Sequence, residues 1–275
     1  MQDPQKVIEH IVHWLRDYAL QARQSGFVVG ISGGIDSALT STLCALTGLP
    51  TCCVELPLHQ PHQQETRAHR HVLWLQAQYP QVEGVKIDLT HDFDSLTSSW
   101  NKSSDAHLQH LTNANTRSRL RMLALYYQAG IRRSLVAGTG NKVEDFGVGF
   151  FTKYGDGGVD ISPIADLKKT EVRELAAFLG IHDEIVSAPP TDGLWEDDRS
   201  DEDQMGATYP ELEWAMDYCE SQLQRHQGQW VLENAPLDNI SERQQEVLKI
   251  YIRLHNANRH KMIPIPICEI PIEWK

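Results

Sequence analysis

The sequence is poor in cysteine, and its few cysteines show no pairing pattern. There are five, an odd number, and no two of them have the C-x-x-C spacing. Such a set argues against a disulfide framework and against a zinc ribbon. We therefore expect reduced, buried thiols in a cytoplasmic protein; they are Cys44, Cys52, Cys53, Cys219 and Cys268.

Long apolar runs and an excess of basic residues are also missing. No stretch approaches the ~20 apolar residues of a membrane-spanning helix. Residues 1–4 begin no basic segment followed by an apolar run, so we expect neither a membrane span nor a signal peptide. The formal net charge of -12 disfavours nucleic acid as a partner, because phosphate backbones are bound by clustered Lys and Arg. An anionic small substrate would need local cationic groups.

The sequence does contain an alternation of short apolar runs with amphipathic stretches. A helix is expected to begin at Asp3-Pro4, with proline in its first turn. The expected strands are 27–31, 51–56, 85–89 and 134–137, and the further helices are 37–46, 62–79, 113–128, 168–179, 209–224 and 241–257. Residues 91–109 show no clear period, and the acidic stretch 189–208 predicts a mobile surface loop.

This alternation predicts a doubly wound α/β fold, in which a parallel sheet is flanked by helices on both faces. The chain has 275 residues, 41% of them hydrophobic, and we expect a single domain over 1–275. Ligands of such folds bind at the carboxyl ends of the strands, near a switch in strand order. The two sharpest motifs follow expected strands.

The first motif, Gly30–Ser37, joins the first strand to a helix. Gly33 and Gly34 allow the main chain to approach a ligand closely. Successive N–H groups at a helix N-terminus form a nest that suits a phosphate. Ser32 and Ser37 add hydroxyl donors, whereas Asp36 would need Mg²⁺ between itself and a phosphate. The structural alternative is a tight turn capped by one of these residues.

This loop is neither a Walker A motif nor G-x-G-x-x-G. The run Ser32–Ser37 reads SGGIDS and resembles the pyrophosphatase loop (SGGxDS) of enzymes that cleave ATP between its α- and β-phosphates. That superfamily includes NAD, GMP and asparagine synthetases and tRNA-modifying enzymes. The loop therefore indicates ATP as a substrate and leaves the second substrate open.

A second motif narrows the family. Residues 149–158 read GFFTKYGDGG and closely resemble a segment of NAD synthetases. The similarity continues through Val159–Pro163 to Lys168-Lys169-Thr170, and it includes the N-x-R-x-R-x-R-M pattern of Asn115–Met122. Together with the phosphate loop it covers most of residues 27–206, and less distinctly the tail around His260-Lys261.

The resemblance implies a role for individual residues. The residues expected to bind ATP are Gly30, Ser32, Gly33, Gly34, Asp36, Ser37, Arg119, Thr139, Lys169 and Thr191. The residues expected to bind deamido-NAD are Arg119, Phe150, Lys153, Asp156, Asp160, His260 and Lys261. Asp36 and Glu144 would hold Mg²⁺, and the catalytic set would be Asp36, Lys153, Asp156 and Lys169. The residue types agree, since Arg forks onto phosphate and Lys neutralises the departing pyrophosphate.

Three departures from the family pattern affect these assignments. The segment between Thr139 and Gly149 has one extra residue, so counting from Thr139 gives Glu144 as the metal ligand and counting back from Phe150 gives Asp145. We prefer Glu144. The loop after Thr191 reads Asp192-Gly193-Leu194 instead of Ala-Asp-Leu, and Glu55 stands where many relatives have arginine.

Several of these side chains also have a structural interpretation. Phe150 would fit a hydrophobic core, and Asp160 would fit the cap of a turn. Arg117, Arg119 and Arg121 alternate along a helix and cannot all face one way. Four histidines near Cys52-Cys53 match no standard zinc spacing and favour a polar helix face; they are His59, His62, His69 and His71.

The implied activity is that of an ammonia-dependent NAD synthetase. ATP would adenylate the nicotinate carboxylate of deamido-NAD, and ammonia would then displace AMP. The length leaves no room for an additional glutaminase domain of ~250 residues, so free ammonia is the expected nitrogen donor unless a separate subunit delivers it. The resemblance implies a homodimer. The alternatives are a GMP- or tRNA-directed adenylating enzyme and a non-catalytic nucleotide-binding module.

Overall fold

The fold is built on a four-stranded parallel sheet. The computed structural model describes the chain except residues 60–61, 192–199 and 233–236 and the side chains of 62–64 and 238. The strands are β1 (Gly26–Gly30), β2 (Thr51–Glu55), β3 (Val82–Lys86) and β4 (Ser134–Val136), in the spatial order β3-β2-β1-β4. The order reverses between β1 and β4, which is the switch point at which α/β folds bind ligands.

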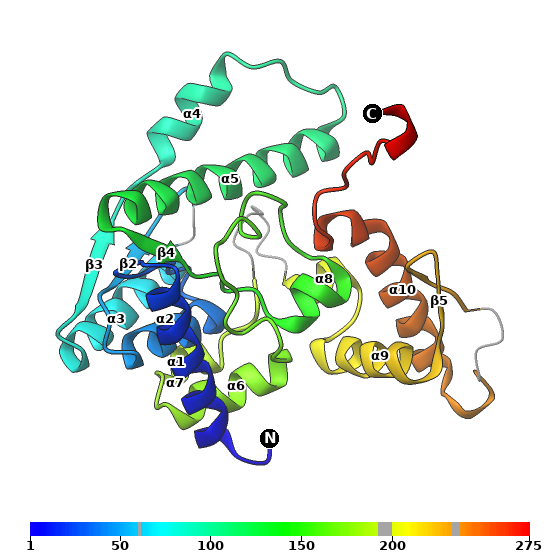
Figure 1. Cartoon of the computed structure of the whole chain (residues 1–275), viewed down its shortest axis with the longest axis horizontal. Coiled ribbons are helices and arrows are strands. Elements are labelled where there is room, and N and C mark those ends of the chain that lie inside the picture. The colour runs from blue at the N-terminus through cyan, green and yellow to red at the C-terminus, as the bar shows by residue number, and fades with distance from the viewer. Residues whose placement is uncertain (60–61, 192–199, 233–236) are drawn as a thin grey trace.

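Helices cover both faces of the sheet (Figure 1), which confirms the predicted doubly wound α/β fold. Phe27 and Val29 of β1 face one group of helices and Val28 faces the other, as the two-residue alternation of a strand requires. The first group is α1 (Pro4–Gln21), α2 (Ile35–Leu46), α3 (His62–Gln78), α6 (Lys169–Phe178) and α7 (Asp183–Val186). The second group is α4 (Thr90–Ser98) and α5 (Ala106–Arg132).

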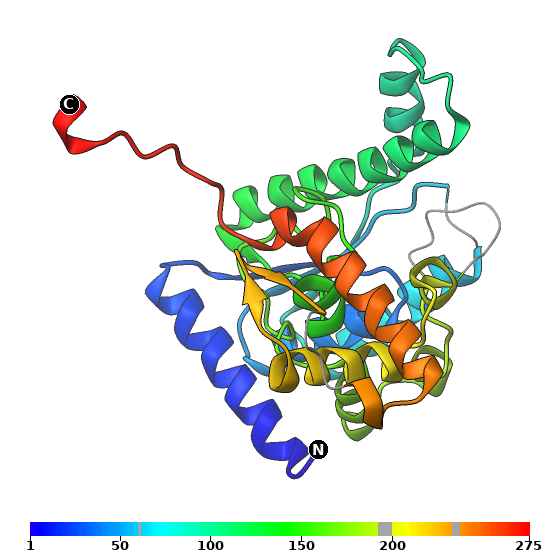
Figure 2. The ribbon, with the colours of Figure 1, turned by 90° about the vertical axis from the view of Figure 1, so that its right-hand side faces the viewer.

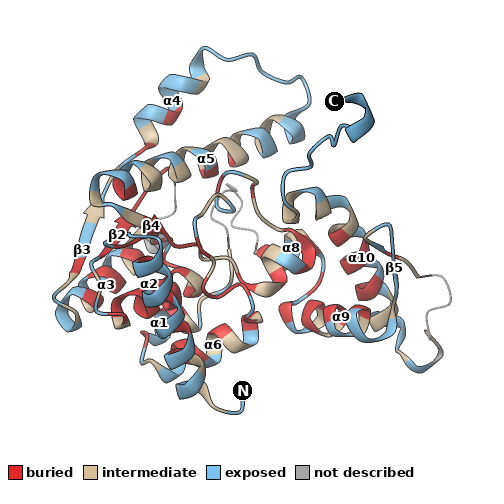
Figure 3. Cartoon of the chain, in the orientation of Figure 1, coloured by how far each residue is buried: buried red, intermediate tan, exposed pale blue. Residues whose placement is uncertain are grey.

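A further apolar cluster lies beside the sheet and is built around Tyr209 and Tyr251. Its elements are a π-helix (Val143–Val148), α8 (Asp201–Met205), α9 (Tyr209–Gln222), β5 (Arg225–His226), β6 (Gln229–Trp230) and α10 (Glu242–Met262). Short 3-10 turns occur at Leu237–Asn239 and Ile272–Trp274. Figure 3 shows buried residues concentrated in the sheet and these helices, with α4 largely exposed.

The helix starts follow from local capping. The Asp3 carboxylate accepts from the Lys6 N–H at 3.2 Å with Pro4 as the first helical residue, so the predicted start of α1 is confirmed. Thr208 and Glu211 form a reciprocal capping box at the start of α9. Among the described residues, none of the helices combines the length and the apolarity that a bilayer crossing requires.

Some predicted boundaries were wrong. The third strand is Val82–Lys86 instead of 85–89, because these five residues pair with β2 over its full length. Beyond it, the Ile87 N–H still bonds to the carbonyl of Glu55, the last residue of β2, and the Leu89 N–H bonds to the carbonyl of Pro57. Helix α5 begins seven residues before the expected position 113, because Asp105 caps it, and the unassigned region before it contains α4. The predicted loop 189–208 contains α8, started by a Ser200–Asp203 capping box; residues 192–199 lie outside the described residues.

The packing of β1 against its neighbour generates a stability prediction. A β-carbon at Gly26 would overlap the carbonyl oxygen of Pro50, whereas one at Gly130 would meet nothing within 4 Å. We expect Gly26→Ala to lower the free energy of unfolding by about 1–3 kcal/mol. Gly130→Ala, in the interior of α5, is expected to raise it by roughly 0.5–1 kcal/mol. Urea denaturation measures both, and equal midpoints for Gly26→Ala and the wild type would contradict the packing.

Candidate active site

A cavity of about 720 Å³ opens at the carboxyl ends of β1, β2 and β4. It is bounded by α5, the π-helix, the start of α6 and the end of α10. Most of the predicted site residues line it: Gly30, Ser32, Gly34, Asp36, Ser37, Arg119, Thr139, Glu144, Phe150, Lys153, Asp156, Lys169, Thr191, His260 and Lys261. The phosphate loop and the GFFTKYGDGG loop, distant in sequence, therefore face one cavity.

The phosphate loop is wound around its own serines. The Ser37 hydroxyl accepts from the Ser32 N–H at 3.2 Å and donates to the Gly34 carbonyl at 2.9 Å, while the Ser32 hydroxyl accepts from the Gly34 N–H at 3.2 Å. Gly33 does not line the cavity, but its φ of 83° makes the turn. Helix α2 follows with Gly34, which has no side chain, as its N-cap. Its first amides thus suit an anion in the cavity.

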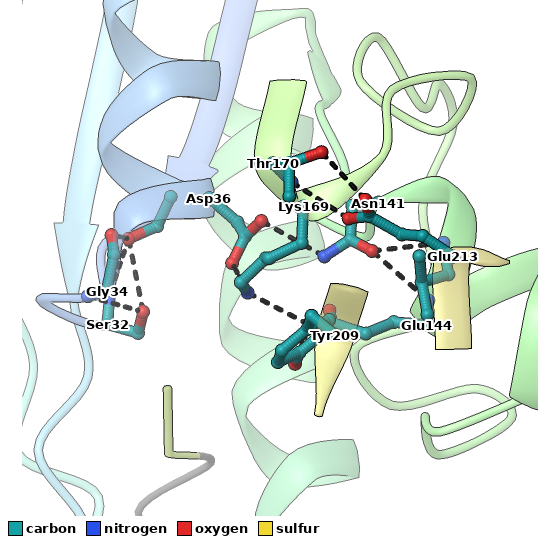
Figure 4. Close-up of polar contacts among 11 residues, drawn as sticks. Ser32, Gly34, Asp36, Asn141, Glu144, Lys169, Thr170, Tyr209 and Glu213 are labelled. Carbon is teal, nitrogen blue, oxygen red and sulfur yellow. Dashed lines mark hydrogen bonds and ion pairs between the residues drawn. The ribbon is translucent and has the colours of Figure 1, made fainter. Parts of the chain in front are cut away.

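A buried lysine joins two carboxylates at the centre of the site (Figure 4). The Lys169 Nζ lies 2.5 Å from Asp36 Oδ2 and 3.0 Å from Glu144 Oε1, and the lysine is only 2% exposed. Burial opposes charge on Lys169, but the two carboxylates raise its pKa. Burial likewise raises the pKa of Asp36, whereas Lys169 and a hydrogen bond from Tyr209 hold the pKa of Glu144 below its usual range despite burial.

This arrangement fits a divalent cation. Asp36 and Glu144 are hard oxygen donors, and the ammonium between them shows that their geometry accommodates a positive charge. Within the described parts of the chain, no group of three or more His, Cys, Asp or Glu side chains is placed to hold a metal alone. The pair therefore suits Mg²⁺ that keeps most of its ligands from a bound phosphate and water.

Glu144 reaches this position from a π-helix, Val143–Val148. A π turn holds more residues than an α turn, and so it accommodates the extra residue predicted between Thr139 and Gly149. Glu144 contacts Lys169, while Asp145 lies beside Gly140. Burial and the neighbouring carboxylates raise the pKa of Asp145 to about 8. Glu144, the preferred metal ligand, thus shares the Lys169 ammonium with Asp36, and Asp145 does not.

The GFFTKYGDGG loop is held by α5 and α10. Asp156 Oδ1 accepts from the Ser118 hydroxyl at 2.7 Å and from the Thr152 N–H at 2.9 Å. Lys261 also lines the cavity and donates to the carbonyl of Phe151 at 2.7 Å, so it braces the loop from α10. Lys153 donates to the carbonyl of His260 at 3.0 Å. These contacts fix the position of Asp156 on the cavity wall.

Some predicted residues have a different environment from the one expected. Asp160 lies outside the main cavity and accepts from the Val136 N–H of β4 at 2.8 Å and from the Tyr126 hydroxyl of α5 at 3.0 Å, so it joins a strand to a helix and does not cap a turn. Phe150 lines the cavity and also packs against the α9–α10 cluster. Arg119 is exposed, with its Nε 3.3 Å from the carbonyl of Lys153.

The structure also places the other residues that the sequence singled out. Arg119 and Arg121 line the cavity, whereas Arg117 stacks on Phe93 of α4, so the three arginines indeed diverge. In the group of four histidines near Cys52-Cys53, the three with described side chains have separate partners. His59 pairs with Asp94, His69 with Glu55 and His71 with Ser41. The side chain of His62 lies outside the described residues. Glu55 thus points to α3, while its neighbours Val54 and Leu56 line the cavity.

Sequence reasoning missed several residues of the site. Arg67 of α3 donates to the Gly33 carbonyl at 3.3 Å, and Arg173 lines the cavity from α6. Asn141 donates to Asp36 Oδ1 at 3.1 Å, and the Tyr209 hydroxyl donates to Glu144 Oε1 at 2.5 Å. Only Asn141 had a signal in the sequence, since it follows a strand end in the expected ligand-binding region.

Comparison with known sequences identifies relatives over most of the chain. The model of the NAD synthase family matches residues 7–262. The NH(3)-dependent NAD(+) synthetase of Carboxydothermus hydrogenoformans is 39% identical over 207 residues, which are 74% of this chain and 82% of the relative. That of Alkaliphilus metalliredigens is 32% identical over 271 residues, which are 96% of this chain and 98% of the relative.

Solved structures agree. The NMN synthetase from Francisella tularensis has a TM-score of 0.80 at 30% identity, and the alignment covers 98% of this chain and 99% of that one. The NAD+ synthetase from Burkholderia pseudomallei has a TM-score of 0.67 at 28% identity, with 94% and 90% covered. Because the family model spans the sheet, the phosphate loop and the second loop of the cavity, this chain belongs to the NAD synthase family.

Proposed function

We propose that this cavity binds ATP beside a nicotinate nucleotide and that the chain converts deamido-NAD to NAD with ammonia. As a member of its family, the chain is an ATP-dependent ligase that forms a C–N bond. The observation that carries the proposal is that the phosphate loop and the GFFTKYGDGG loop line the same cavity, with Lys169 and its carboxylates between them.

The ATP half of the site lies at the switch point. The amides at the start of α2 and the hydroxyls of Ser32 and Ser37 suit the β- and γ-phosphates. Asp36 and Glu144 would hold Mg²⁺, which when bound supplies charge neutralisation on the departing pyrophosphate. Lys169 adds a second positive charge at the same place. Thr139 and Thr191 line the same part of the chain's cavity and would contact the nucleotide.

The nicotinate half lies against the second loop. Phe150 offers a flat face to a pyridine ring, and Lys153 and Arg119 offer positive charge near the mouth of the cavity. Asp156 is fixed by Ser118 and the Thr152 amide, so its carboxylate is held in place for the nicotinate end. The end of α10, with His260 and Lys261, closes this side.

The chemistry is mainly positioning and charge stabilisation. A nicotinate carboxylate oxygen attacks the α-phosphorus of ATP, and the bond from that phosphorus to the pyrophosphate oxygen breaks. Ammonia then attacks the acyl carbon, AMP leaves with the bonding pair, and the nitrogen loses a proton. Holding the two substrates together makes the first step effectively unimolecular. Fixed cations stabilise the negative charge that develops on the leaving group.

A mononucleotide is a second candidate substrate. The structure with a TM-score of 0.80 to this chain is described as an NMN synthetase, which suggests amidation of nicotinate mononucleotide by the same chemistry. The curated relatives named NH(3)-dependent NAD(+) synthetases favour the dinucleotide. The two candidates share the adenylation site and differ only in what lies beyond the first ribose phosphate.

A homodimer in the cytoplasm completes the proposal. Leu123, Tyr127 and Ile131 lie along one face of α5 and are 61%, 68% and 61% exposed. Ile267 and Ile272 of the C-terminal segment, which runs away from the body in Figure 2, are 83% and 87% exposed. Exposed apolar groups of this kind favour a partner, and a second copy is the commonest one. All five cysteines are free, in keeping with a reducing compartment; four are buried as expected, whereas Cys268, also expected to be buried, is exposed.

The activity is tested with purified protein, ATP, Mg²⁺, ammonium and either deamido-NAD or nicotinate mononucleotide. We expect NAD, AMP and pyrophosphate in equal amounts from deamido-NAD, with a lower kcat/KM for the mononucleotide. Liquid chromatography measures the products. A higher kcat/KM for the mononucleotide would select the second candidate, and ATP binding without any amide product would refute both.

Removal of the Asp36 carboxylate tests the metal assignment. Asp36→Ala is expected to lower kcat by at least about 100-fold, as the loss of a group that stabilises developing charge does, while circular dichroism stays that of the folded protein. Asp92→Ala, an exposed carboxylate on α4, is the matched control and should keep full activity. Wild-type turnover by Asp36→Ala would contradict the assignment.

The apolar face of α5 generates a prediction on assembly. Tyr127→Glu would bury a charge in the proposed interface, so we expect light scattering to give the mass of a monomer for this variant and of a dimer for the wild type. Phe178→Glu changes an aromatic residue of α6 that is 52% exposed and should leave the dimer intact. A monomeric wild type at micromolar concentration would exclude the homodimer.

A further inference from the structure

Glu144 and Lys169, the two groups proposed to act on ATP, are both held in place by one helix, α9. This helix contributes little to the wall of the cavity. Tyr209 is the first residue of α9 and Glu213 follows one turn later, so the two side chains lie on the same face. Tyr209 is fully buried and Glu213 is 7% exposed. Figure 4 shows both directed at the Lys169 region.

Tyr209 acts on Glu144. Its hydroxyl donates to Glu144 Oε1 at 2.5 Å, and Lys169 donates to that same oxygen at 3.0 Å. The ring of Tyr209 lies under the ammonium, with Nζ 4.7 Å from the ring centroid. Because both donors engage Oε1, they fix the carboxylate in one orientation and leave Oε2 as the oxygen that neither occupies.

Glu213 acts on Lys169 through the backbone. It accepts from the Thr170 N–H at 2.9 Å and from the Thr170 hydroxyl at 2.7 Å. Thr170 is the second residue of α6, directly after Lys169. A carboxylate at a helix N-terminus satisfies an otherwise unpaired amide and is favoured by the helix dipole. The first turn of α6, and with it the lysine backbone, is therefore clamped to α9.

The start of α9 is itself rigidly supported. The Tyr209 N–H donates to Glu202 of α8 at 2.9 Å. Glu211 joins the capping box with Thr208 and also accepts from Arg243 of α10 at 2.8 Å. The hydrogen bond from Arg243 lowers the pKa of Glu211 to about 2, despite the opposing effect of its partial burial. Helices α8 and α10, together with the Thr208 cap, thus hold the one turn that presents Tyr209 and Glu213.

We propose that Tyr209 and Glu213 are positioning residues of the ligase: Tyr209 orients the Glu144 carboxylate toward Mg²⁺, and Glu213 fixes Lys169 at the phosphates. The inference rests on the proposed function for the identity of the ligands. Partners of metal-binding side chains typically affect metal affinity or activity by about 10- to 100-fold. A phenol oxygen at position 209 and an acceptor oxygen at position 213 are needed for this role, whereas packing alone would accept Phe at position 209.

Tyr209→Phe removes only the phenol oxygen. We expect its half-saturating Mg²⁺ concentration to rise by about 10-fold or more, its kcat to recover at high Mg²⁺, and its KM for deamido-NAD to stay unchanged. Calorimetry measures the affinity for a non-hydrolysable ATP analogue with and without Mg²⁺. The gain in affinity that Mg²⁺ causes should be smaller for the variant than for the wild type. Tyr251→Phe is the matched control, because Tyr251 is 2% exposed in the same apolar cluster and lies outside the cavity lining.

Glu213→Ala tests the second half of the inference. The affinity of this variant for the ATP analogue should fall both with and without Mg²⁺, because losing the Glu213 carboxylate displaces Lys169 and does not act on the metal ligands. Glu213→Gln, which keeps an acceptor for the Thr170 N–H, should restore most of that affinity. Equal effects of Tyr209→Phe and Tyr251→Phe on Mg²⁺ dependence, or wild-type analogue affinity in Glu213→Ala, would overturn the inference. A wild type that binds the analogue but forms no amide would overturn the proposed function alone.

Discussion

One buried ammonium between two carboxylates organises this molecule. Lys169 is placed where burial alone would favour its neutral form, and it stays charged because Asp36 and Glu144 contact it. Removing Lys169 would leave two carboxylates without a counter-charge in a poorly hydrated site, which is strongly unfavourable. The three come from α2, the π-helix and α6, so the same ion cluster that creates a place for a phosphate-bound cation also joins three separate segments.

The architecture explains how such distant residues meet. In a parallel sheet all the carboxyl ends lie at one edge, and the reversal of strand order between β1 and β4 separates the two following loops enough to admit a ligand. The phosphate loop follows β1, and the turn with Asn141 follows β4. The cluster around α9 and α10 then supports the site from outside the sheet. The Lys169 cluster is thus supported by elements that form no part of the sheet.

The sequence predicted the part of this account that follows from local pattern. Strand–helix alternation is sufficient to predict the sheet, and the glycine–serine loop is sufficient to locate the phosphate site. It could not predict that a π turn would bring Glu144 to Lys169, nor that Tyr209, at the start of an expected helix, would reach Glu144. These contacts depend on how the α9–α10 cluster packs. The partner of Asp160, the Val136 N–H of β4, is likewise visible only in the fold.

The most direct test of the central claim is the anomalous scattering of Mn²⁺ in a crystal soaked with a non-hydrolysable ATP analogue and deamido-NAD. The account predicts an anomalous peak between the carboxylates of Asp36 and Glu144, a triphosphate on residues 32–37, and the Lys169 ammonium moved onto a phosphate oxygen. A triphosphate bound elsewhere, or Lys169 still bridging both carboxylates with the metal at another position, would contradict it.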